Sequence, residues 1–167
     1  KDYSGAIGLE SEPGQGAHFN IYLPLVEHPR QIVNEAADEL TPGGNETILF
    51  IDDEAALVEA AHIMLQQLGY RVFIETRPEE ALRIFKNDSR GFDLIITDKT
   101  MPYMTGFDIA REVRCLRQDI PIILCTGNLT MEDKKKIEIA PITEVVMKPI
   151  KRQALAEIIR KVLQKKQ

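Results

Sequence analysis

The sequence predicts an α/β protein built on a doubly wound, five-stranded parallel sheet. From residue 46 onward, short apolar runs rich in β-branched side chains alternate with helical patterns. This alternation is typical of strands that are joined through helices in a parallel sheet. The connections are too short for anything but right-handed crossovers. Acidic residues directly follow two of the runs, at the strand ends where such folds carry their chemistry.

Each of the five strands is predicted from a short apolar run that is followed by a helical pattern. Runs of this length and composition indicate buried parallel strands. The predicted strands span residues 47–51, 70–74, 92–97, 120–125 and 144–147.

The first two helices are predicted from apolar spacing and from residues that start or end a helix. The first lies near 54–68 and carries an apolar face. Gly69 follows it and is a usual helix stop. The second lies near 78–87, and Pro78 occupies a first-turn position that tolerates a missing N–H. The apolar face of the first helix comprises Leu57, Ala61, Met64, Leu65 and Leu68.

Three further helices follow the other strands. One lies near 106–116, after a loop that runs from Asp98 to Gly106. The next lies near 131–138, where Thr130 is a candidate N-cap with Asp133 three residues on. The last lies near 151–165 and has an apolar stripe. This stripe comprises Leu155, Ile158, Ile159 and Val162.

The segment before residue 46 differs from the rest. Residues 1–26 predict a β-hairpin with strands at 6–11 and 17–23, joined by a Pro- and Gly-containing turn. A lone hairpin is marginal in water, so we expect it to belong to a larger domain. Residues 27–45 are predicted to be a linker, in which helical spacing permits a short helix without requiring one. The residues with that spacing are Ile32, Ala36 and Leu40.

Composition limits the classes of function. The chain has 167 residues and a net charge of −5, so no general nucleic-acid surface is expected. No apolar run reaches membrane-spanning length and no signal peptide opens the chain, which predicts a cytoplasmic protein without membrane contact. The first residue is Lys1, which indicates a piece of a longer protein. Cys115 and Cys125 are expected to be buried free thiols.

Carboxylates at two strand ends carry the chemical prediction. Asp52 and Asp53 follow strand 47–51, and Asp98 follows strand 92–97. In one parallel sheet these side chains crowd a single crevice, and their repulsion requires a cation. Oxygen-only ligands suit Mg²⁺. Taken in isolation, Asp52 and Asp53 are also compatible with capping the first helix and complementing its dipole.

Two other strand ends supply a hydroxyl and a cation. Thr126 follows strand 120–125 and Lys148 follows strand 144–147. A lysine provides a point charge for a phosphoryl group, and a threonine hydroxyl donates to a phosphoryl oxygen. An aspartate beside a bound divalent ion can accept a phosphoryl group. The set of strand-end residues therefore predicts phosphoryl transfer to Asp98.

Other classes that use similar sheets fit less well. A flavin carrier needs a phosphate-holding loop after the first strand, where Asp52 and Asp53 would repel the phosphate. The phosphate loop of nucleotide hydrolases, Gly-x-x-x-x-Gly-Lys-Ser/Thr, is absent from the sequence. Phosphatases of the haloacid dehalogenase type use Asp-x-Asp-x-Thr, and the run that starts at Asp98 lacks the second aspartate.

Four motifs surround these strand ends. They are Ile51-Asp52-Asp53-Glu54, Thr97-Asp98-Lys99-Thr100-Met101-Pro102-Tyr103-Met104-Thr105-Gly106, Leu124-Cys125-Thr126-Gly127 and Met147-Lys148-Pro149-Ile150. With these motifs, residues 46–167 resemble the receiver domain of two-component response regulators. The resemblance implies the strand order 2-1-3-4-5 of a flavodoxin-like receiver and phosphorylation of Asp98 by a phosphohistidine. It also implies Mg²⁺ held by Asp52, Asp53, Asp98 and the backbone carbonyl of Thr100, with Thr126 as the switch hydroxyl and Lys148 as the phosphate-binding lysine.

The same resemblance predicts partners and two local features. The phosphodonor is expected to be a histidine kinase or a histidine phosphotransfer domain, and the chain is expected to be a monomer or weak dimer. Many receivers place Tyr or Phe three residues before the lysine, where this chain has Val145. A valine cannot make the ring movement that accompanies activation. The Lys148–Pro149 peptide is expected to be cis, as is common in related receivers.

Residues 4–25 resemble the end of a histidine-kinase ATP-binding domain, with a Glu-Ser-x-x-Gly-x-Gly turn between two strands. The match covers only about the last two strands of such a domain. The resemblance implies a hybrid sensor histidine kinase as the parent, while this chain alone is not a complete kinase and has no ATP site. The segment before residue 46 is expected to be disordered or packed on the receiver or a neighbouring chain. An alternative is a receiver kept as a docking module with vestigial phosphorylation.

Overall fold

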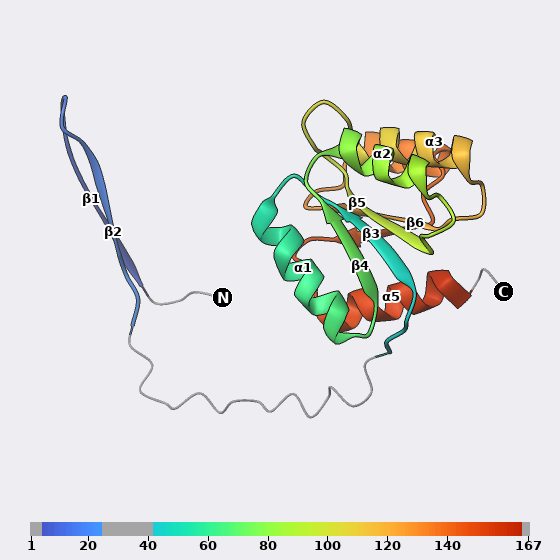
Figure 1. Cartoon of the computed structure of the whole chain (residues 1–167). Helices are drawn as coiled ribbons and strands as arrows, with labels where there is room; N and C mark the ends of the chain where they lie inside the picture. Colours follow the sequence, from blue (N-terminus) through green and yellow to red (C-terminus); the bar gives the residue numbers. More distant parts are fainter. Residues whose placement is uncertain (1–4, 25–41, 165–167) are drawn as a thin grey trace. The chain divides into compact units, whose positions relative to one another are not determined.

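The computed structural model describes residues 5–24 and 42–164, which belong to two separate units of the chain (Figure 1). The first unit contains the hairpin and the second contains the five-stranded sheet. The short helix that the sequence permits between Ile32 and Leu40 lies outside the described residues.

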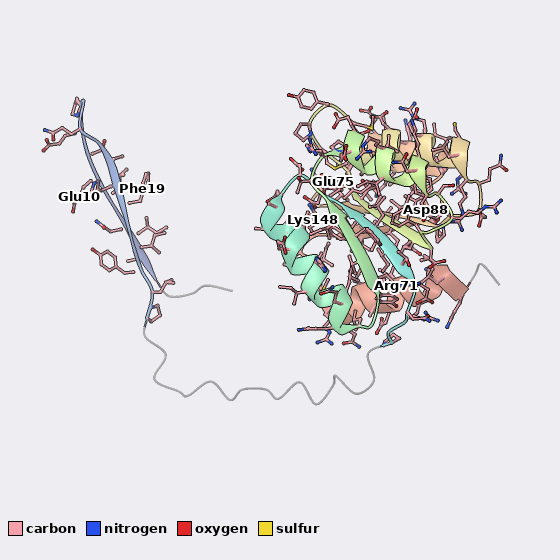
Figure 2. The ribbon with its side chains drawn as sticks, in the orientation of Figure 1. Glu10, Phe19, Arg71, Glu75, Asp88 and Lys148 are labelled. Carbon is pink, nitrogen blue, oxygen red and sulfur yellow. The ribbon has the colours of Figure 1, made fainter. Side chains whose placement is uncertain are left out.

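The first unit is the predicted hairpin. Strands β1 (Ala6–Glu12) and β2 (Gly16–Tyr22) pair antiparallel, with Leu9 opposite Phe19. Opposed residues of an antiparallel pair share a face. Figure 2 shows the hairpin with its side chains. Ile7, Leu9, Phe19 and Ile21 lie on one face and are 59–75% exposed, so this apolar face is uncovered within the described residues.

The second unit is built on a parallel sheet with the order β4-β3-β5-β6-β7. Numbered from the first strand of this unit, this is the predicted order 2-1-3-4-5. Every residue of the three central strands is buried, as expected where helices cover both faces of a parallel sheet. The strands are β3 (Thr47–Ile51), β4 (Arg71–Glu75), β5 (Leu94–Asp98), β6 (Ile122–Thr126) and β7 (Glu144–Met147).

Two helices cover each face of this sheet (Figure 1). Side chains of α1 and α5 pack in one apolar core, and those of α2 and α3 pack in the other. Helix α4 contributes no buried residue to either core. The helices are α1 (Ala55–Gln67), α2 (Pro78–Asn87), α3 (Gly106–Leu116), α4 (Met131–Ile139) and α5 (Arg152–Gln164).

Two details of the packing differ from the prediction. The predicted buried face of α1 includes Leu57, but this residue is 38% exposed and Val58 is buried in its place. Val58, Ala61 and Leu65 have helical spacing and form the buried stripe, and Leu57 lies one position to the side of it. Cys115 is exposed near the end of α3, whereas Cys125 is buried as expected.

The predicted N-cap of α4 and the predicted glycine stop after α1 are both present. Thr130 caps α4, and its side chain accepts a hydrogen bond from the Asp133 backbone N–H. Thr105 starts α3 in the same way, with Asp108 at the third position. Gly69 follows α1 with a φ of 91°, a left-handed conformation that favours glycine. These local sequence features account for the starts of α3 and α4 and for the end of α1.

The chain that enters the sheet is tied to two helices. The Gly44 N–H donates to the carbonyl of Leu68 over 3.0 Å, just beyond α1. The Glu46 carboxylate lies 2.5 Å from the Arg160 guanidinium on α5. The residues just before β3 therefore form part of the packed unit.

Candidate functional site

Four of the predicted site residues lie at the carboxyl edge of the sheet. Asp98 is the last residue of β5 and Thr126 the last of β6, while Asp52 follows β3 and Lys148 follows β7. Figure 2 shows Lys148 and Glu75 at this end of the sheet and Arg71 at the other. Three of the residues are buried, with Asp52 1%, Thr126 2% and Asp98 7% exposed.

Lys148 connects the two buried carboxylates. Its Nζ lies 2.7 Å from Asp52 Oδ2 and 2.6 Å from Asp98 Oδ1. Burial alone would lower the pKa of the lysine, but the hydrogen bonds to Asp52 and Asp98 outweigh it, so the pKa is raised above its usual value. Lys148 is therefore a stable cation at physiological pH. The Lys148–Pro149 peptide is cis, as predicted.

Backbone amides complete the hydrogen bonding of the two carboxylates. The Thr100 N–H donates to Asp98 Oδ2 over 2.6 Å, and the Glu54 N–H donates to Asp52 Oδ1 over 3.0 Å. Each carboxylate thus uses one oxygen for Lys148 and the other for a loop amide. Both side chains are held in fixed orientations.

Asp53 follows Asp52 directly and is exposed. Among residues 5–24 and 42–164, no three acidic, His or Cys side chains form a ready-made metal cluster. The structure brings together Asp52, Asp98 and Lys148, with Thr126 at the neighbouring strand end.

The side chains present suit a hard divalent cation. Asp52, Asp98 and the carbonyl of Thr100 offer only oxygen donors, the type that Mg²⁺ prefers. The nearby Cys125 packs in the core between α1 and α5. Burial raises the pKa of its thiol to about 12, so the thiol is protonated at physiological pH. The donor set therefore fits magnesium.

Thr126 is oriented toward its own loop. Its hydroxyl donates to the carbonyl of Asn128 over 2.6 Å and accepts from the Asn128 N–H over 3.2 Å. The donor hydrogen of the Thr126 hydroxyl is therefore used by the Asn128 carbonyl.

Lys99 also takes part in this site, although the sequence analysis did not identify it as a site residue. Its Nζ donates to the Asn128 carbonyl over 2.7 Å and pairs with Asp133 Oδ2 at 2.9 Å. The Lys99 hydrogen bond and those from Thr130 hold the pKa of the Asp133 carboxyl below its usual range. Lys99 therefore connects the end of β5 with the loop before α4. Its position next to Asp98 was visible in the sequence, but its partners lie 29 and 34 residues away.

Gly106 allows the loop after β5 to close tightly. A Cβ at this position would lie 2.3 Å from the carbonyl oxygen of Asp98 and 2.6 Å from Leu124 Cδ1. The Gly106 N–H donates to the carbonyl of Lys99 over 3.0 Å. Only glycine permits this approach beside the candidate site.

The fold and these strand-end residues together define a receiver domain of two-component systems. Residues 48–160 match the family described as the response regulator receiver domain, and the chain belongs to that family. The predicted family and fold class are thereby confirmed.

Several sensor proteins are similar to this chain. ArcB, the aerobic respiration control sensor protein of Escherichia coli K12, is 28% identical over 96% of this chain and 21% of its own length. The sensor kinase CckA of Brucella abortus is 29% identical over 99% of this chain and 18% of its own. The sensor protein EvgS of E. coli K12 is 33% identical over 81% of this chain. The chain spans about a fifth or less of the length of these relatives.

Solved structures agree with the fold. A receiver domain protein from Clostridium thermocellum has a TM-score of 0.69 at 29% identity and covers 72% of this chain and 96% of its own. The receiver domain of the sensor histidine kinase PA1611 from Pseudomonas aeruginosa has a TM-score of 0.65 at 27% identity, over 72% of this chain and 99% of its own. Its structure contains a magnesium ion in the active-site cleft. TrrA from Thermotoga maritima, in complex with Mg²⁺ and beryllofluoride, has a TM-score of 0.62 at 32% identity, over 70% of this chain and 98% of its own.

None of the helices in residues 5–24 and 42–164 is long and apolar enough to cross a lipid bilayer.

Proposed function

We propose that the chain accepts a phosphoryl group on Asp98 from a phosphohistidine, in a reaction that requires Mg²⁺. The observation that carries this proposal is the buried Asp98 carboxylate at the end of β5, whose Oδ1 lies 2.6 Å from Lys148 Nζ. Neighbours of the same family contain Mg²⁺ in their active sites, which supports the same ion here.

Each residue at the sheet edge has a role in this reaction. An Asp98 oxygen attacks phosphorus, the bond from phosphorus to the donor's imidazole nitrogen breaks, and its electron pair returns to the imidazole. Lys148 neutralises negative charge on the transferred group, and Thr126 donates a hydrogen bond to one of its oxygens. Asp52, Asp53, Asp98 and the Thr100 carbonyl would hold the magnesium ion. When bound, this ion supplies positive charge to the carboxylates and to the phosphoryl oxygens.

A phosphorylation experiment tests this function. The protein is incubated with acetyl phosphate and Mg²⁺ and its intact mass is measured. One phosphoryl group should be added, and Asp98→Asn should remove the addition. Asp88→Asn is the matched control, because Asp88 is an exposed aspartate on the far side of α2 from the site and asparagine can still accept its hydrogen bond from the Gly91 N–H. Undiminished labelling of Asp98→Asn would contradict the assignment.

Metal binding is tested separately. Asp53→Ala should weaken Mg²⁺ binding, as measured by the Mg²⁺ concentration that half-saturates labelling. Labelling that does not depend on Mg²⁺ would contradict the proposed metal requirement. Absence of any added phosphoryl group would point to the alternative, a receiver-fold docking module with vestigial phosphorylation. The salt bridges of Lys148 to Asp52 and Asp98 are compatible with that alternative, since they satisfy both carboxylates without a metal.

The leading segment is proposed to be the end of a histidine-kinase ATP-binding domain. In this proposal, residues 1–26 form that fragment, 27–45 the linker and 46–167 the receiver. The support is the uncovered apolar face of the hairpin and the similarity to ArcB, which spans 96% of this chain and so includes part of this segment. The chain alone should not bind ATP. Saturable micromolar binding of ATP and Mg²⁺ in a calorimetric titration would contradict this proposal.

The expected cellular setting follows from the same reaction. We propose that this chain is cytoplasmic and that a histidine kinase or histidine phosphotransfer domain is its phosphodonor. The receiver is proposed to act as a monomer or weak dimer and without nucleic acid. Transfer of radiolabelled phosphate from an autophosphorylated histidine kinase, followed by size-exclusion chromatography, tests both the donor class and the oligomeric state.

A further inference from the structure

Helix α4 is held differently from the other helices of the described unit. It contributes no buried residue, whereas α1, α2, α3 and α5 each place three or more residues in the core. Apolar burial is the main source of helix attachment in a domain of this kind. Polar contacts at the start of α4 must therefore carry an unusual share of its attachment.

Lys99 provides these contacts from the residue next to Asp98. Its side chain is 16% exposed and pairs with Asp133 in the first turn of α4. Asp133 Oδ2 also accepts hydrogen bonds from the backbone N–H and the hydroxyl of Thr130. A single carboxylate oxygen thus links the capping box of α4 to the end of β5.

The Asn128 carbonyl is shared between Lys99 and Thr126. It accepts a hydrogen bond from the Thr126 hydroxyl over 2.6 Å and one from Lys99 Nζ over 2.7 Å. A carbonyl oxygen has two lone pairs and satisfies both donors at once. Lys99 therefore helps to fix the position of the acceptor to which the Thr126 hydroxyl donates.

We propose that Lys99 is a positioning residue that stabilises the resting arrangement of the β6–α4 loop and so opposes the movement of Thr126 toward a phosphoryl group on Asp98. This inference rests on the proposed function. To reach a phosphoryl oxygen, the Thr126 hydroxyl must leave the Asn128 carbonyl, and the loop that carries this carbonyl must shift. Each contact that Lys99 makes only in the resting arrangement adds to the free energy of that shift.

Val145 makes the β6–α4 loop more important for coupling Asp98 to its surroundings. Val145 lies on β7 in register with Leu124 of β6 and has no ring that could rotate. The coupling between Asp98 and its surroundings then depends on the loop and on the start of α4. Lys99 touches both.

Affinity for beryllofluoride, a mimic of the phosphoryl group, tests the inference. In the presence of Mg²⁺, Lys99→Met should bind beryllofluoride more tightly than the wild type, by about fivefold, the upper range for a single ion pair of limited exposure. The gain should require the Thr126 hydroxyl. It should therefore vanish when Lys99→Met is made in a Thr126→Val background, which a double-mutant cycle measures directly.

Three further variants separate positioning from a general effect on structure. Lys99→Arg keeps the cation and should restore affinity to near the wild-type value. Asp133→Asn keeps an oxygen for the capping box but loses the charge, and should reproduce part of the gain. Lys136→Met removes a lysine of α4 that pairs with Glu132 at the surface, and should leave the affinity unchanged.

The outcomes are distinct. Unchanged or weaker beryllofluoride binding by Lys99→Met, beside normal binding by the wild type, would overturn the inference. An equal gain with and without the Thr126 hydroxyl would also overturn it. Absence of Mg²⁺-dependent beryllofluoride binding by the wild type would instead reject the proposed function, and the positioning role would fail with it.

Discussion

At the scale of single residues, Lys148 acts as a built-in counter-ion. Its ammonium group lies between the carboxylates of Asp52 and Asp98, which would otherwise repel each other in a buried setting. The same two carboxylates are the proposed ligands of Mg²⁺. The lysine and the metal ion therefore compete for the negative charge of one pair of side chains.

Replacement of Lys148 should lower the stability of the metal-free protein and increase the stabilisation that Mg²⁺ provides. Lys148→Met should lower the free energy of unfolding in the absence of Mg²⁺ by about 3 kcal/mol, since it leaves two buried carboxylates uncompensated. Mg²⁺ should then stabilise the variant more than the wild type, because ligand binding to the folded state adds to stability. Urea unfolding with and without Mg²⁺ measures both effects.

Lys161→Met is the control, because Lys161 forms an ion pair with Glu144 in which its own side chain is largely exposed. This variant should show little change in stability and the wild-type response to Mg²⁺. If Mg²⁺ stabilises Lys148→Met no more than it stabilises the wild type, then the lysine and the ion do not compete for the two carboxylates.

Gly106 offers a second test at the scale of one residue. Gly106→Ala should destabilise the domain by about 1–3 kcal/mol, because the new methyl group would overlap the Asp98 carbonyl and Leu124. Gly127→Ala is the matched control, since a Cβ there meets no atom within 4 Å. Thermal unfolding compares the two variants, and equal losses of stability would show that the close approach at Gly106 is not the cause.

At the scale of elements, the sequence predicts the fold well because local signals and long-range packing agree. The order of strands and helices follows from the apolar runs, and the capping of α4 follows from Thr130 and Asp133. Three strands end one residue later than predicted: β4, β5 and β6 end at Glu75, Asp98 and Thr126. Cross-strand pairing extends these strands, since Asp98 is in register with Cys125, and apolar content alone does not report such pairing.

The site was predictable only in part. Asp52, Asp98, Thr126 and Lys148 share one edge because parallel strands place their ends together. The contacts of Lys99 were not predictable, because they depend on how the loop before α4 folds back across β5. The residues next to a lysine in the sequence do not indicate which distant group its side chain will contact.

Helix α4 should be the least stable helix of the described unit. Native-state hydrogen exchange should show its amides exchanging through local openings of low free energy, while amides of β5 and β6 exchange only on global unfolding. The reason is that α4 buries no side chain, whereas the two strands are fully buried. Protection of α4 amides equal to that of β5 would contradict this expectation.

At the scale of the whole chain, the receiver should fold without the hairpin unit. A fragment that starts at Pro42 keeps the Gly44 and Glu46 contacts with Leu68 and Arg160 and should melt at the temperature of the full chain. A fragment that starts at Thr47 loses two backbone hydrogen bonds, from the Gly44 N–H to Leu68 and from the Arg71 N–H to Glu46, and one ion pair. It should melt lower by about 5–10 °C. Scanning calorimetry of the two fragments tests this directly.

The ion pair can be examined on its own. Arg160→Met in the longer fragment should reproduce part of the loss, because it removes the partner of Glu46 and keeps the backbone hydrogen bond of Gly44. A longer fragment that melts well below the full chain would instead show that residues before Pro42 contribute to the stability of the receiver.

The absence of buried side chains in α4 also determines which part of the domain can vary in sequence. Core positions restrict substitutions to residues of matching shape, whereas exposed helix positions accept most residues at little cost in folding free energy. Apart from Asp133 of the capping box and the partly buried Ile137, the residues of α4 are exposed and carry no such restriction. Recognition of new partners could therefore be selected on this helix from a library of variants, with the phosphoryl-accepting edge of the sheet left intact.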